Sequence, residues 1–356
     1  MPPSSSRLKG LLAAALLVSP LLGCAPENGS GVQSQKLAAI TGRDRLICGV
    51  DGTLPGFSFM ETDGRYSGLD VDVCKAVAAS VLGDPDKVDY RNLSPSERFA
   101  ALASGEVDLL SRNTTKTISR DAPGGNALSF APTVFYDGQG VMVPVASGIR
   151  SFSDLAGKPI CVQSGTTTEL TLADRMRQQA TPYTPLKFQS SEQTVAAYLG
   201  GRCVAVSSDR SGLAGQRTSF PSPDQHVLLP DVLSKEPLSP ATVNADPAWA
   251  DAVRWTIYAL MQAEELGITK ANLESRLAEA RANVQLADLR RFLGIEGDFG
   301  TQLGLPADFT VRAIKAVGNY GEIFERNVGS GSRLKLDRGL NRQWKDGGLV
   351  YSPPFR

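Results

Sequence analysis

The sequence predicts an α/β protein made of two successive units and a mostly helical C-terminal part. In residues 46–110, short apolar strand-like runs alternate with helical patterns in the order βαβαβ, which is typical of a sheet covered by helices. The same alternation starts again at residue 159 and continues to residue 207. From residue 249 onward helical patterns dominate, and a chain of 356 residues is long enough for two such domains.

Each element follows from the spacing of its apolar residues. Short runs rich in Val, Leu and Ile predict strands at 46–50, 88–90, 107–110, 141–145, 159–162, 186–188 and 204–207. Apolar residues three and four apart predict helices at 71–82, 96–104, 167–179, 192–199, 248–265, 271–282 and 309–327. Trp249 and Trp255 fall in one of these helices, and their spacing favours packing over contact with a cofactor.

The N-terminus resembles an export signal. Two basic residues precede an apolar run, Leu11–Leu22, that is too short to span a bilayer but fits the core of a secretory signal. The run ends in Leu-Leu-Gly-Cys24, which resembles a bacterial lipobox, although an ordinary signal peptide that happens to contain Cys24 is the alternative. We expect a signal peptide at 1–23, a polar tether at 24–39, and a periplasmic or otherwise extracytoplasmic protein, lipid-anchored to the membrane if Cys24 is modified.

Charge and hydropathy exclude several classes of protein. The chain has 37 basic and 37 acidic residues, and it contains no basic run of the kind that binds nucleic acid. No later apolar stretch is long enough to cross a membrane. We therefore expect no nucleic-acid partner, and contact with a membrane only through an N-terminal lipid.

Three polar loops carry the groups that a zwitterion requires. Arg120 lies in SRNTTKTISRD (111–121) and Asp209 in SSDRSGL (207–213), while QSGTTTEL (163–170) is a Gly-Thr turn that opens a helix. A guanidinium can hold a carboxylate by two hydrogen bonds, helix-start amides favour the same anion, and a carboxylate can hold an ammonium. The simplest ligand with both charges is an α-amino acid.

Each of these features also has a purely structural interpretation. Arg120 could form a surface pair with its neighbour Asp121, and Asp209 could pair with Arg210 or Arg202. The Gly-Thr turn could simply cap its helix, since threonine caps well, and capping and anion binding use the same amides. Near the start of the 71–82 helix, Asp70 and Asp72 are expected to be helix caps.

The cysteine count suggests disulfide bonds. Apart from Cys24 the chain has Cys48, Cys74, Cys161 and Cys203, and an even number in an oxidising compartment favours bridges. Three pairings are open, and four buried thiols are the alternative. There is no CxxC motif and only one histidine, His226, so we expect neither a metal site nor a cofactor.

A series of longer motifs closely resembles one family, the general L-amino-acid-binding proteins of polar-amino-acid ABC importers, within the type II periplasmic solute-binding proteins. The motifs are LPGFS (54–58), GLDVDVC (68–74), SGEVDLLSRNTT (104–115), YDGQG (136–140), CVQSGTTTEL (161–170), SDRSGL (208–213), SKEPL (234–238), AIKAVGNYGEIFERN (313–327) and the ending YSPPFR. The resemblance implies two α/β lobes joined by two hinge strands, with the ligand enclosed between them.

The implied lobes are a first lobe at 40–140 and 239–356, which includes the helical C-terminal extension, and a second lobe at 141–238. The hinge strands would pass near 138–145 and 236–243. Within such lobes the pairings Cys48 to Cys74 and Cys161 to Cys203 are favoured, because each bridge would stay inside one lobe and leave the hinge free.

The resemblance also implies roles for residues in the three loops. Arg120 would grip the α-carboxylate and Asp209 would receive the α-ammonium. Asn113 and Thr115 would offer backbone and side-chain hydrogen bonds, and Gly165, Thr166 and Thr167 would add amide and hydroxyl donors. Leu54 and Phe57 would form a wall for the ligand side chain, which Arg112 would face. Lys116 departs from the family pattern, which usually has an aromatic residue there; if it points toward the ligand it favours acidic or amide side chains, and if it points to solvent a broad preference remains.

The function implied is capture of L-amino acids by a monomer that delivers them to the permease subunits of an ABC importer. The alternatives are an enzyme on the same fold, similar to cyclohexadienyl dehydratase, or a ligand-sensing protein. We expect no enzyme, because the candidate site has no histidine, no obvious Ser-His or Cys-His partnership, and a single carboxylate, Asp209, already used for the ammonium.

Overall fold

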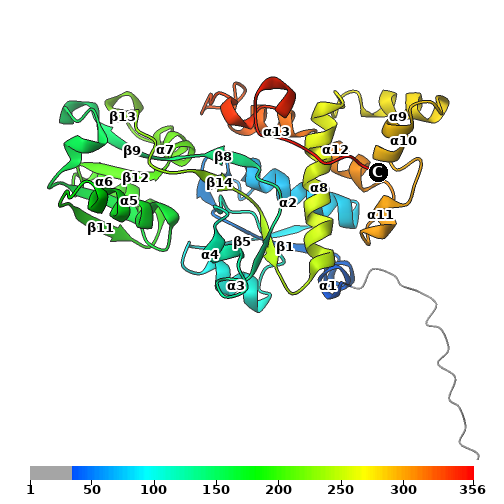
Figure 1. Cartoon of the computed structure of the whole chain (residues 1–356), viewed down its shortest axis with the longest axis horizontal. Helices are drawn as coiled ribbons and strands as arrows, with labels where there is room; N and C mark the ends of the chain where they lie inside the picture. Colours follow the sequence, from blue (N-terminus) through cyan, green and yellow to red (C-terminus); the bar gives the residue numbers. More distant parts are fainter. Residues whose placement is uncertain (1–33) are drawn as a thin grey trace, which may run out of the picture. The chain divides into compact units, whose positions relative to one another are not determined.

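The computed structural model describes residues 34–356 (Figure 1). Their strands form two five-stranded mixed sheets, each with helices packed around it, so the predicted two-lobed α/β fold is confirmed. The predicted signal peptide, Cys24 and most of the predicted tether lie outside the described residues. Among residues 34–356, no helix combines the length and the apolar character needed to cross a membrane.

The first sheet has the strand order β5-β1-β6-β15-β7. β1 pairs in parallel with β5 and β6, whereas β15 is antiparallel to β6 and β7. The strands are β1 (Leu46–Val50), β5 (Val88–Asn92), β6 (Leu109–Leu110), β7 (Leu128–Phe130) and β15 (Ala241–Val243). Helices of this part include α2 (Leu69–Leu82), α3 (Arg98–Ser104), α4 (Ile118–Asp121) and α8 (Pro247–Glu265), and a small sheet is formed by β2 (Thr53–Leu54), β3 (Ser58–Met60) and β4 (Tyr66–Ser67).

The second sheet has the order β11-β10-β12-β9-β13. β10 is parallel to β11 and β12, and β9 is antiparallel to β12 and β13. The strands are β9 (Gln139–Pro144), β10 (Pro159–Gln163), β11 (Thr184–Phe188), β12 (Ala205–Asp209) and β13 (His226–Leu228). The helices are α5 (Thr167–Gln178), α6 (Ser191–Leu199) and α7 (Arg210–Arg217). Parallel strands bring their carboxyl ends to one edge, so the loops after β10 and β12 start beside each other.

Two strands connect the sheets. β8 (Phe135–Asp137) pairs antiparallel with β14 (Glu236–Leu238), and Glu236 lies directly opposite Asp137 (Figure 1). The chain passes from β8 into β9 of the second sheet, and from β14 into β15 of the first. This pair is therefore the link through which any movement of one sheet against the other must pass.

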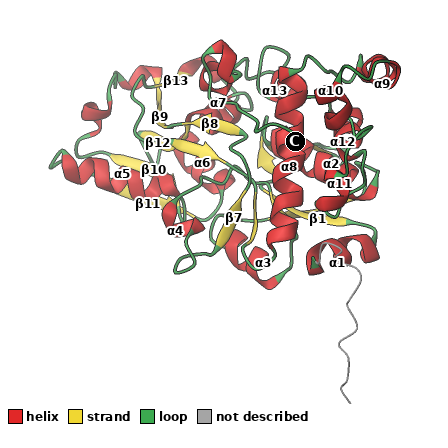
Figure 2. Ribbon diagram, turned by 45° about the vertical axis from the view of Figure 1, so that its right-hand side comes forward, coloured by secondary structure: helices red, strands yellow, loops and turns green. Residues whose placement is uncertain are grey.

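The C-terminal part adds helices to the first sheet. They are α9 (Leu273–Ala282), α10 (Ala287–Phe292), α11 (Phe299–Gln302), α12 (Phe309–Val317) and α13 (Tyr320–Asn327). α2, α8 and α12 pack against one another (Figure 2), and they bury Trp249, Phe309 and Ile314 in the larger core. Trp249 also donates its indole N–H to the carbonyl of Asp108 at 2.8 Å, which confirms the packing role predicted for it.

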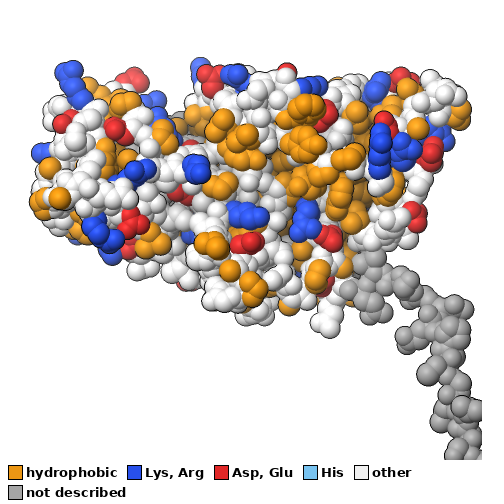
Figure 3. Space-filling view, in the orientation of Figure 1, with side chains coloured by type: hydrophobic (Ala, Val, Ile, Leu, Met, Phe, Trp, Pro, Cys, Tyr) orange, Lys and Arg blue, Asp and Glu red, His pale blue; other side chains and the backbone are white. Residues whose placement is uncertain are grey.

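The face shown in Figure 3 has apolar side chains gathered over α8 and the C-terminal segment. Exposed large side chains of this segment include Leu340, Trp344, Leu349 and Tyr351. The ring of Trp344 lies edge-on to that of Tyr351, and its indole N–H reaches Glu265. The segment is thus attached to α8 and does not form a separate domain.

The long helix predicted at 309–327 is wrong in one respect, because the structure divides it into α12 and α13. Gly318 has φ +81°, and the following Asn319 starts a new helix as its N-cap. The Asn319 side chain accepts from the amide of Glu322, and the Glu322 carboxylate accepts from the amide of Asn319. This capping box satisfies amides that a continuous helix would bond to carbonyls one turn earlier.

We predict that Asn319→Ala lowers the free energy of unfolding by about 1–2 kcal/mol, the usual cost of losing an N-cap. The change also removes the bond from Asn319 Nδ2 to the carbonyl of Ile268 (2.7 Å). Denaturant titration measures the effect. Asn126→Ala is the control because Asn126 is exposed, and equal stability of the two variants would contradict the capping role.

The N-terminal helix α1 (Gln35–Arg43) includes residues that we assigned to the tether. Ser34 caps it by accepting from the amide of Leu37, and Leu37 and Ile40 are buried in the larger core. Asp246, before α8, accepts from both Ser34 and Lys36. Residues 35–39 are therefore helical, because two apolar side chains at helical spacing find a buried place there.

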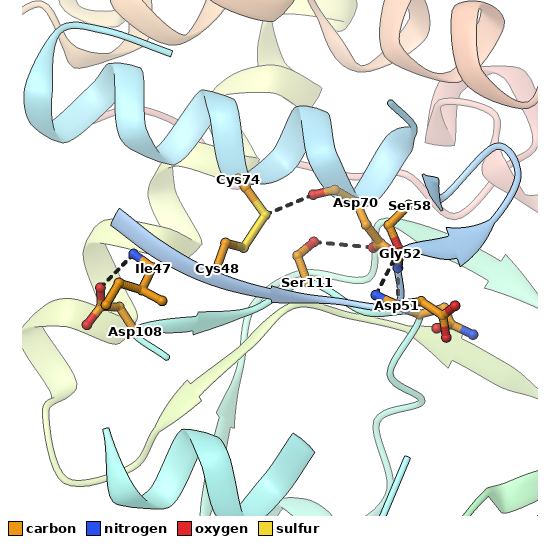
Figure 4. The surroundings of a disulfide bond; sticks show 10 residues. Ile47, Cys48, Asp51, Gly52, Ser58, Asp70, Cys74, Asp108 and Ser111 are labelled. Atoms are coloured by element: carbon orange, nitrogen blue, oxygen red, sulfur yellow. Dashed lines mark hydrogen bonds between the residues drawn. A yellow bond between two sulfur atoms is a disulfide. The ribbon is translucent and has the colours of Figure 1, made fainter. Parts of the chain in front are cut away.

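The four cysteines of the described residues form two disulfides, Cys48–Cys74 and Cys161–Cys203. These are the favoured pairings. The first joins β1 to the overlying α2 (Figure 4), and the second joins β10 to the segment before β12. Neither bridge connects the two sheets.

Candidate functional site

The loop that follows β6 is held in place by Asp70. This buried carboxylate accepts from the amide of Asn113 at 2.9 Å and from the hydroxyl of Ser111 at 3.2 Å (Figure 4 shows the latter). Asn113 has φ +35°, a backbone conformation that asparagine tolerates better than most residues. Burial raises the pKa of Asp70 to about 6, against the lowering effect of these hydrogen bonds. Asp70 thus fixes the conformation of the loop.

The prediction that Asp70 and Asp72 cap α2 is wrong. The first two amides of α2, those of Leu69 and Asp70, donate instead to the carbonyls of Gly56 and Phe57, so no side-chain cap is needed. Asp72 binds elsewhere, accepting from Arg326 and Asn327 at 2.6 Å each. The first-turn carboxylates of α2 are therefore free to hold other parts of the chain.

Arg112, in the same loop, is occupied by protein partners. Its Nη2 lies 2.5 Å from the carboxylate of Asp51, and its Nε donates to the carbonyl of Leu93 at 2.6 Å. Its Nη1 is 3.3 Å from the side-chain oxygen of Asn113. The structure therefore places Arg112 as a support for the loop backbone.

Arg120, on the short helix α4, is arranged differently. Its side chain is only 6% exposed, its Nη1 donates to the carbonyl of Thr115 at 2.8 Å, and its guanidinium carbon lies 5.2 Å from the ring centre of Phe99. Within residues 34–356 it forms no ion pair, either with exposed Asp121 or with any other carboxylate. Burial lowers the pKa of Arg120, whereas the charges of Glu236 and Asp209 raise it.

Thr115 presents its backbone amide away from the hinge strand. Lys116 donates to the carbonyl of Pro237, and Ser239 donates to the carbonyl of Thr114, both at 2.9 Å. In this antiparallel arrangement the N–H and C=O of Thr115 point to the other side, where its carbonyl meets Arg120. The amide of Thr115 and the guanidinium of Arg120 therefore face the same space.

The Gly-Thr turn after β10 caps α5, which is the structural interpretation given for this turn in the sequence analysis. Thr166 accepts from the amide of Glu169 at 3.0 Å, and Glu169 in turn accepts from the amide of Gly165 at 2.9 Å. Gly165 has φ +74°, and a Cβ on it would lie 3.4 Å from the backbone of Ser96, so the second sheet's loop meets the first part of the chain here. Thr167 is the first residue of α5, and its hydroxyl lies 3.3 Å from that of Thr115.

Asp209, at the end of β12, is buried and has no cationic partner among the residues that the structure describes. It is 6% exposed, and the side-chain amide of Asn113 approaches it at 3.5 Å. Arg210 donates instead to the carbonyls of Leu229 and Asp231, and Arg202 is exposed over the ring of Phe188. Burial, reinforced by the charges of Asp137 and Glu236, raises the pKa of Asp209 well above its ordinary value.

Two predicted residues lie at the margin of this arrangement. Phe57 packs edge-on against Phe135 in the larger core, with 5.2 Å between the ring centres. Leu54 lies beside Gly212 of α7, since a Cβ atom added to Gly212 would be 3.7 Å from the Cδ1 of Leu54. Lys116 is exposed, and its ammonium is 6.0 Å from the ring of Phe130. This corresponds to the solvent-facing alternative for Lys116.

Sequence reasoning missed three charged residues beside the site, of which Glu236 and Arg98 are buried and Asp137 is half-buried. Glu236 and Asp137 face each other on β14 and β8, and Arg98 begins α3. Arg98 is 3% exposed, and within residues 34–356 its Nε has no partner and its Nη1 contacts the hydroxyl of Thr114 at 3.3 Å. Burial raises the pKa of Asp137 to about 6 and lowers that of Arg98 well below its usual range. The sequence did offer a signal for the two carboxylates, because Glu236 is part of the SKEPL motif and Asp137 is part of the YDGQG motif.

The site thus separates positive from negative charge. Arg120 and Arg98 belong to the first part of the chain, whereas Asp209 lies at the end of a strand of the second sheet, with Asp137 and Glu236 on the connecting strands. None of the five forms an ion pair with another residue of 34–356. Buried charges without partners are costly, and a ligand that carries both an anionic and a cationic group supplies both partners. In the described residues, no group of His, Cys, Asp and Glu is arranged to hold a metal ion.

Comparison with known sequences agrees with this geometry. The family model of bacterial extracellular solute-binding proteins, family 3, matches residues 46–273. The chain is 47% identical over 344 residues to the general L-amino acid-binding periplasmic protein AapJ of Rhizobium johnstonii, covering 96% of this chain and 99% of that protein. It is 50% identical over 317 residues to the glutamate/glutamine/aspartate/asparagine-binding protein BztA of Rhodobacter capsulatus, covering 89% and 92%.

Solved structures show the same relationship. An ABC transporter periplasmic binding protein from Brucella ovis with glutathione bound has a TM-score of 0.86 and 49% identity, covering 91% of this chain and 100% of that one. The cysteine-binding protein from Campylobacter jejuni has a TM-score of 0.58 and 25% identity, covering 64% and 88%. The resemblance read from the motifs is confirmed, and the chain belongs to the bacterial extracellular solute-binding proteins, family 3.

Proposed function

We propose that this protein captures L-α-amino acids in the periplasm and delivers them to an ABC importer. The observation that carries the proposal is the pair Arg120 and Asp209, two buried and opposite charges from different sheets that have no ionic partner within residues 34–356. The names of AapJ and BztA, which describe a general L-amino acid-binding periplasmic protein and a protein for four specified amino acids, support it.

In the proposed complex the α-carboxylate lies on the guanidinium of Arg120. The outward-facing amide of Thr115 and the helix-start amides of α5 add hydrogen bonds, since α5 starts beside Thr115, with 3.3 Å between the hydroxyls of Thr167 and Thr115. The α-ammonium lies on Asp209. Each charge of the ligand then neutralises a charge that burial otherwise makes unfavourable.

The proposed lobes are residues 40–140 with 239–356, and residues 141–238. The paired strands β8 and β14 would serve as the hinge, because they are the connections between the two sheets in the described chain. A ligand held by Arg120 on one side and Asp209 on the other has to enter before the lobes close and leave after they open. The two disulfides support this movement, because each stays within one sheet and its helices.

The proposed ligand range is broad. AapJ is named for general L-amino acids, BztA for glutamate, glutamine, aspartate and asparagine, and the Brucella protein was solved with glutathione. Glutathione is joined through the side chain of its glutamyl group, which keeps a free α-carboxylate and α-ammonium. The chemistry shared by all of these ligands is the zwitterionic head group, and exposed Lys116 adds no selection for acidic side chains.

Calorimetric titration of refolded protein tests the proposal. Unfolding and refolding first remove any ligand carried over from the cell, and the probes are the common L-amino acids, their D-enantiomers, glutathione and N-acetyl-L-glutamate. We expect several L-amino acids to bind with dissociation constants near or below about 1 μM, equivalent to about 8 kcal/mol, and N-acetylation to abolish binding. If none of the L-amino acids binds, the proposed function is wrong.

A further inference from the structure

Glu236 lies where both lobes and the hinge meet. Its side chain, on strand β14, is 1% exposed. Its Oε2 accepts from the hydroxyl of Thr115 at 2.6 Å and from the hydroxyl of Thr167 at 2.9 Å. Its Oε1 accepts from the hydroxyl of Ser234. A single carboxylate therefore binds one threonine from the loop after β6 and another from the start of α5.

These contacts determine the direction of both threonine hydroxyls. A hydroxyl has one proton to donate and two lone pairs to accept with, whereas a carboxylate only accepts. When Thr115 and Thr167 give their protons to Glu236, only lone pairs remain for any third group. The two hydroxyl oxygens are 3.3 Å apart, close enough for one ligand group to reach both.

Lone pairs suit an ammonium and not a carboxylate. An ammonium has three N–H donors and no acceptor, and its proposed counter-charge, Asp209, is approached at 3.5 Å by the side-chain amide of Asn113, two residues before Thr115. The backbone amide of Thr115 keeps its donor for the opposite end of the ligand. Glu236 thereby changes what the sequence suggested for Thr167, whose hydroxyl was expected to be a donor.

We propose that Glu236 is a positioning residue that turns the hydroxyls of Thr115 and Thr167 into acceptors, so that they bind the ligand ammonium together with Asp209. The inference rests on the proposed function and adds a determinant of selectivity to it: Glu236 touches no ligand atom, yet it sets the preference for an α-amino group. Because one threonine partner lies in the loop after β6 of the first sheet and the other starts α5 beside the second sheet, the same carboxylate also joins the two proposed lobes.

The test compares ligands with and without the amino group. The probes are L-glutamate with glutarate and L-leucine with 4-methylpentanoate, titrated into wild-type protein and Glu236→Leu. Leucine has a similar volume but no acceptor, so nothing holds the protons of the two threonine hydroxyls away from the ligand. We expect affinity for the amino acid to fall at least tenfold, affinity for its desamino analogue to change less than threefold, and the selectivity ratio to fall accordingly.

A role in folding alone would give another pattern. In that case both ligands of a pair lose affinity equally and the melting temperature falls, an outcome that would overturn the inference. Glu192→Leu, on an exposed carboxylate of α6, is the matched control and should retain wild-type selectivity. Thr167→Val and Thr167→Ser provide a second test: valine should reduce selectivity for the amino acid and serine should keep it, whatever the stability of Glu236→Leu.

The outcomes separate the two proposals. If wild-type protein binds neither L-glutamate nor L-leucine nor any other amino acid, the proposed function is wrong. If wild-type protein prefers the amino acids and Glu236→Leu has the same preference, the proposed function stands and the role of Glu236 is wrong.

Discussion

Replacing Arg120 by alanine is expected to abolish measurable binding of L-amino acids while leaving the protein folded. The guanidinium is 6% exposed and has no carboxylate partner within residues 34–356, so the α-carboxylate of the ligand is its proposed counter-charge. Removing one partner of a desolvated, hydrogen-bonded charge pair costs about 2–5 kcal/mol. A micromolar site then has a dissociation constant near or above the millimolar range.

Stability without ligand should change little in this variant. The mutation removes an unpaired buried charge, which is favourable, and it leaves the carbonyl of Thr115 without its donor, which costs about 1–3 kcal/mol. Calorimetry measures the binding and thermal unfolding measures the fold. Arg150→Ala, on an exposed arginine, is the control, and Arg120→Lys should be intermediate because it keeps the charge but not the planar fork. Unchanged affinity in Arg120→Ala would sink the carboxylate assignment.

The regular elements could be predicted because their signals are local. The apolar run at 46–50 and the helical spacing at 71–82 reappear as β1 and α2, the latter extended by two residues at its start. The boundary between α12 and α13 was missed although its signal was also local: a glycine followed by an asparagine with glutamate three residues later is a capping box inside an apolar periodic pattern. The periodicity continued across the break and concealed it.

The site was predicted less completely, because much of it depends on contacts between distant residues. Asp70 looked like a cap from its position in the sequence, but its partner amide is 43 residues away at Asn113. Glu236 contacts Thr115, 121 residues away, and nothing in the local sequence of β14 indicates this. Arg120 and Asp209 were proposed because charged residues in short polar loops are conspicuous and because the surrounding motifs resemble a known family; their roles in binding stay predictions.

Replacing Asp209 by asparagine is expected to abolish amino-acid binding and, at neutral pH, to make the ligand-free protein more stable. The change removes the proposed counter-charge of the ammonium with almost no change in volume, and the loss is again about 2–5 kcal/mol in a site that excludes water. The gain in stability has a separate origin. Burial raises the pKa of Asp209 well above the ordinary value of 3.8, so holding this group as a carboxylate in the folded protein is unfavourable.

The direction of the pH dependence follows from that shift. A raised folded-state pKa means that the folded protein binds the proton more tightly than the unfolded chain. The stability this contributes is fully present below the unfolded value near 3.8, and it is lost as pH rises through the raised folded value. Asp70 and Asp137, whose pKa values burial raises to about 6, act in the same direction in both proteins. The wild-type melting temperature should therefore fall relative to that of Asp209→Asn between about pH 4 and pH 7.

Ligand binding should show the opposite dependence. An ammonium pairs with ionised Asp209, so wild-type protein below the raised pKa has to release a proton before it binds, and its affinity increases as pH rises through that value. Calorimetry in buffers of different ionisation enthalpy measures the released proton, and the residual binding of Asp209→Asn should not show this release. Two outcomes would contradict the assignment. If wild-type protein bound glutarate and L-glutamate with equal affinity, the ligand ammonium would need no counter-charge. If Asp209→Asn melted below wild type at pH 7, the burial of the Asp209 carboxylate would not be unfavourable, and Asp209 would not be available as a counter-charge.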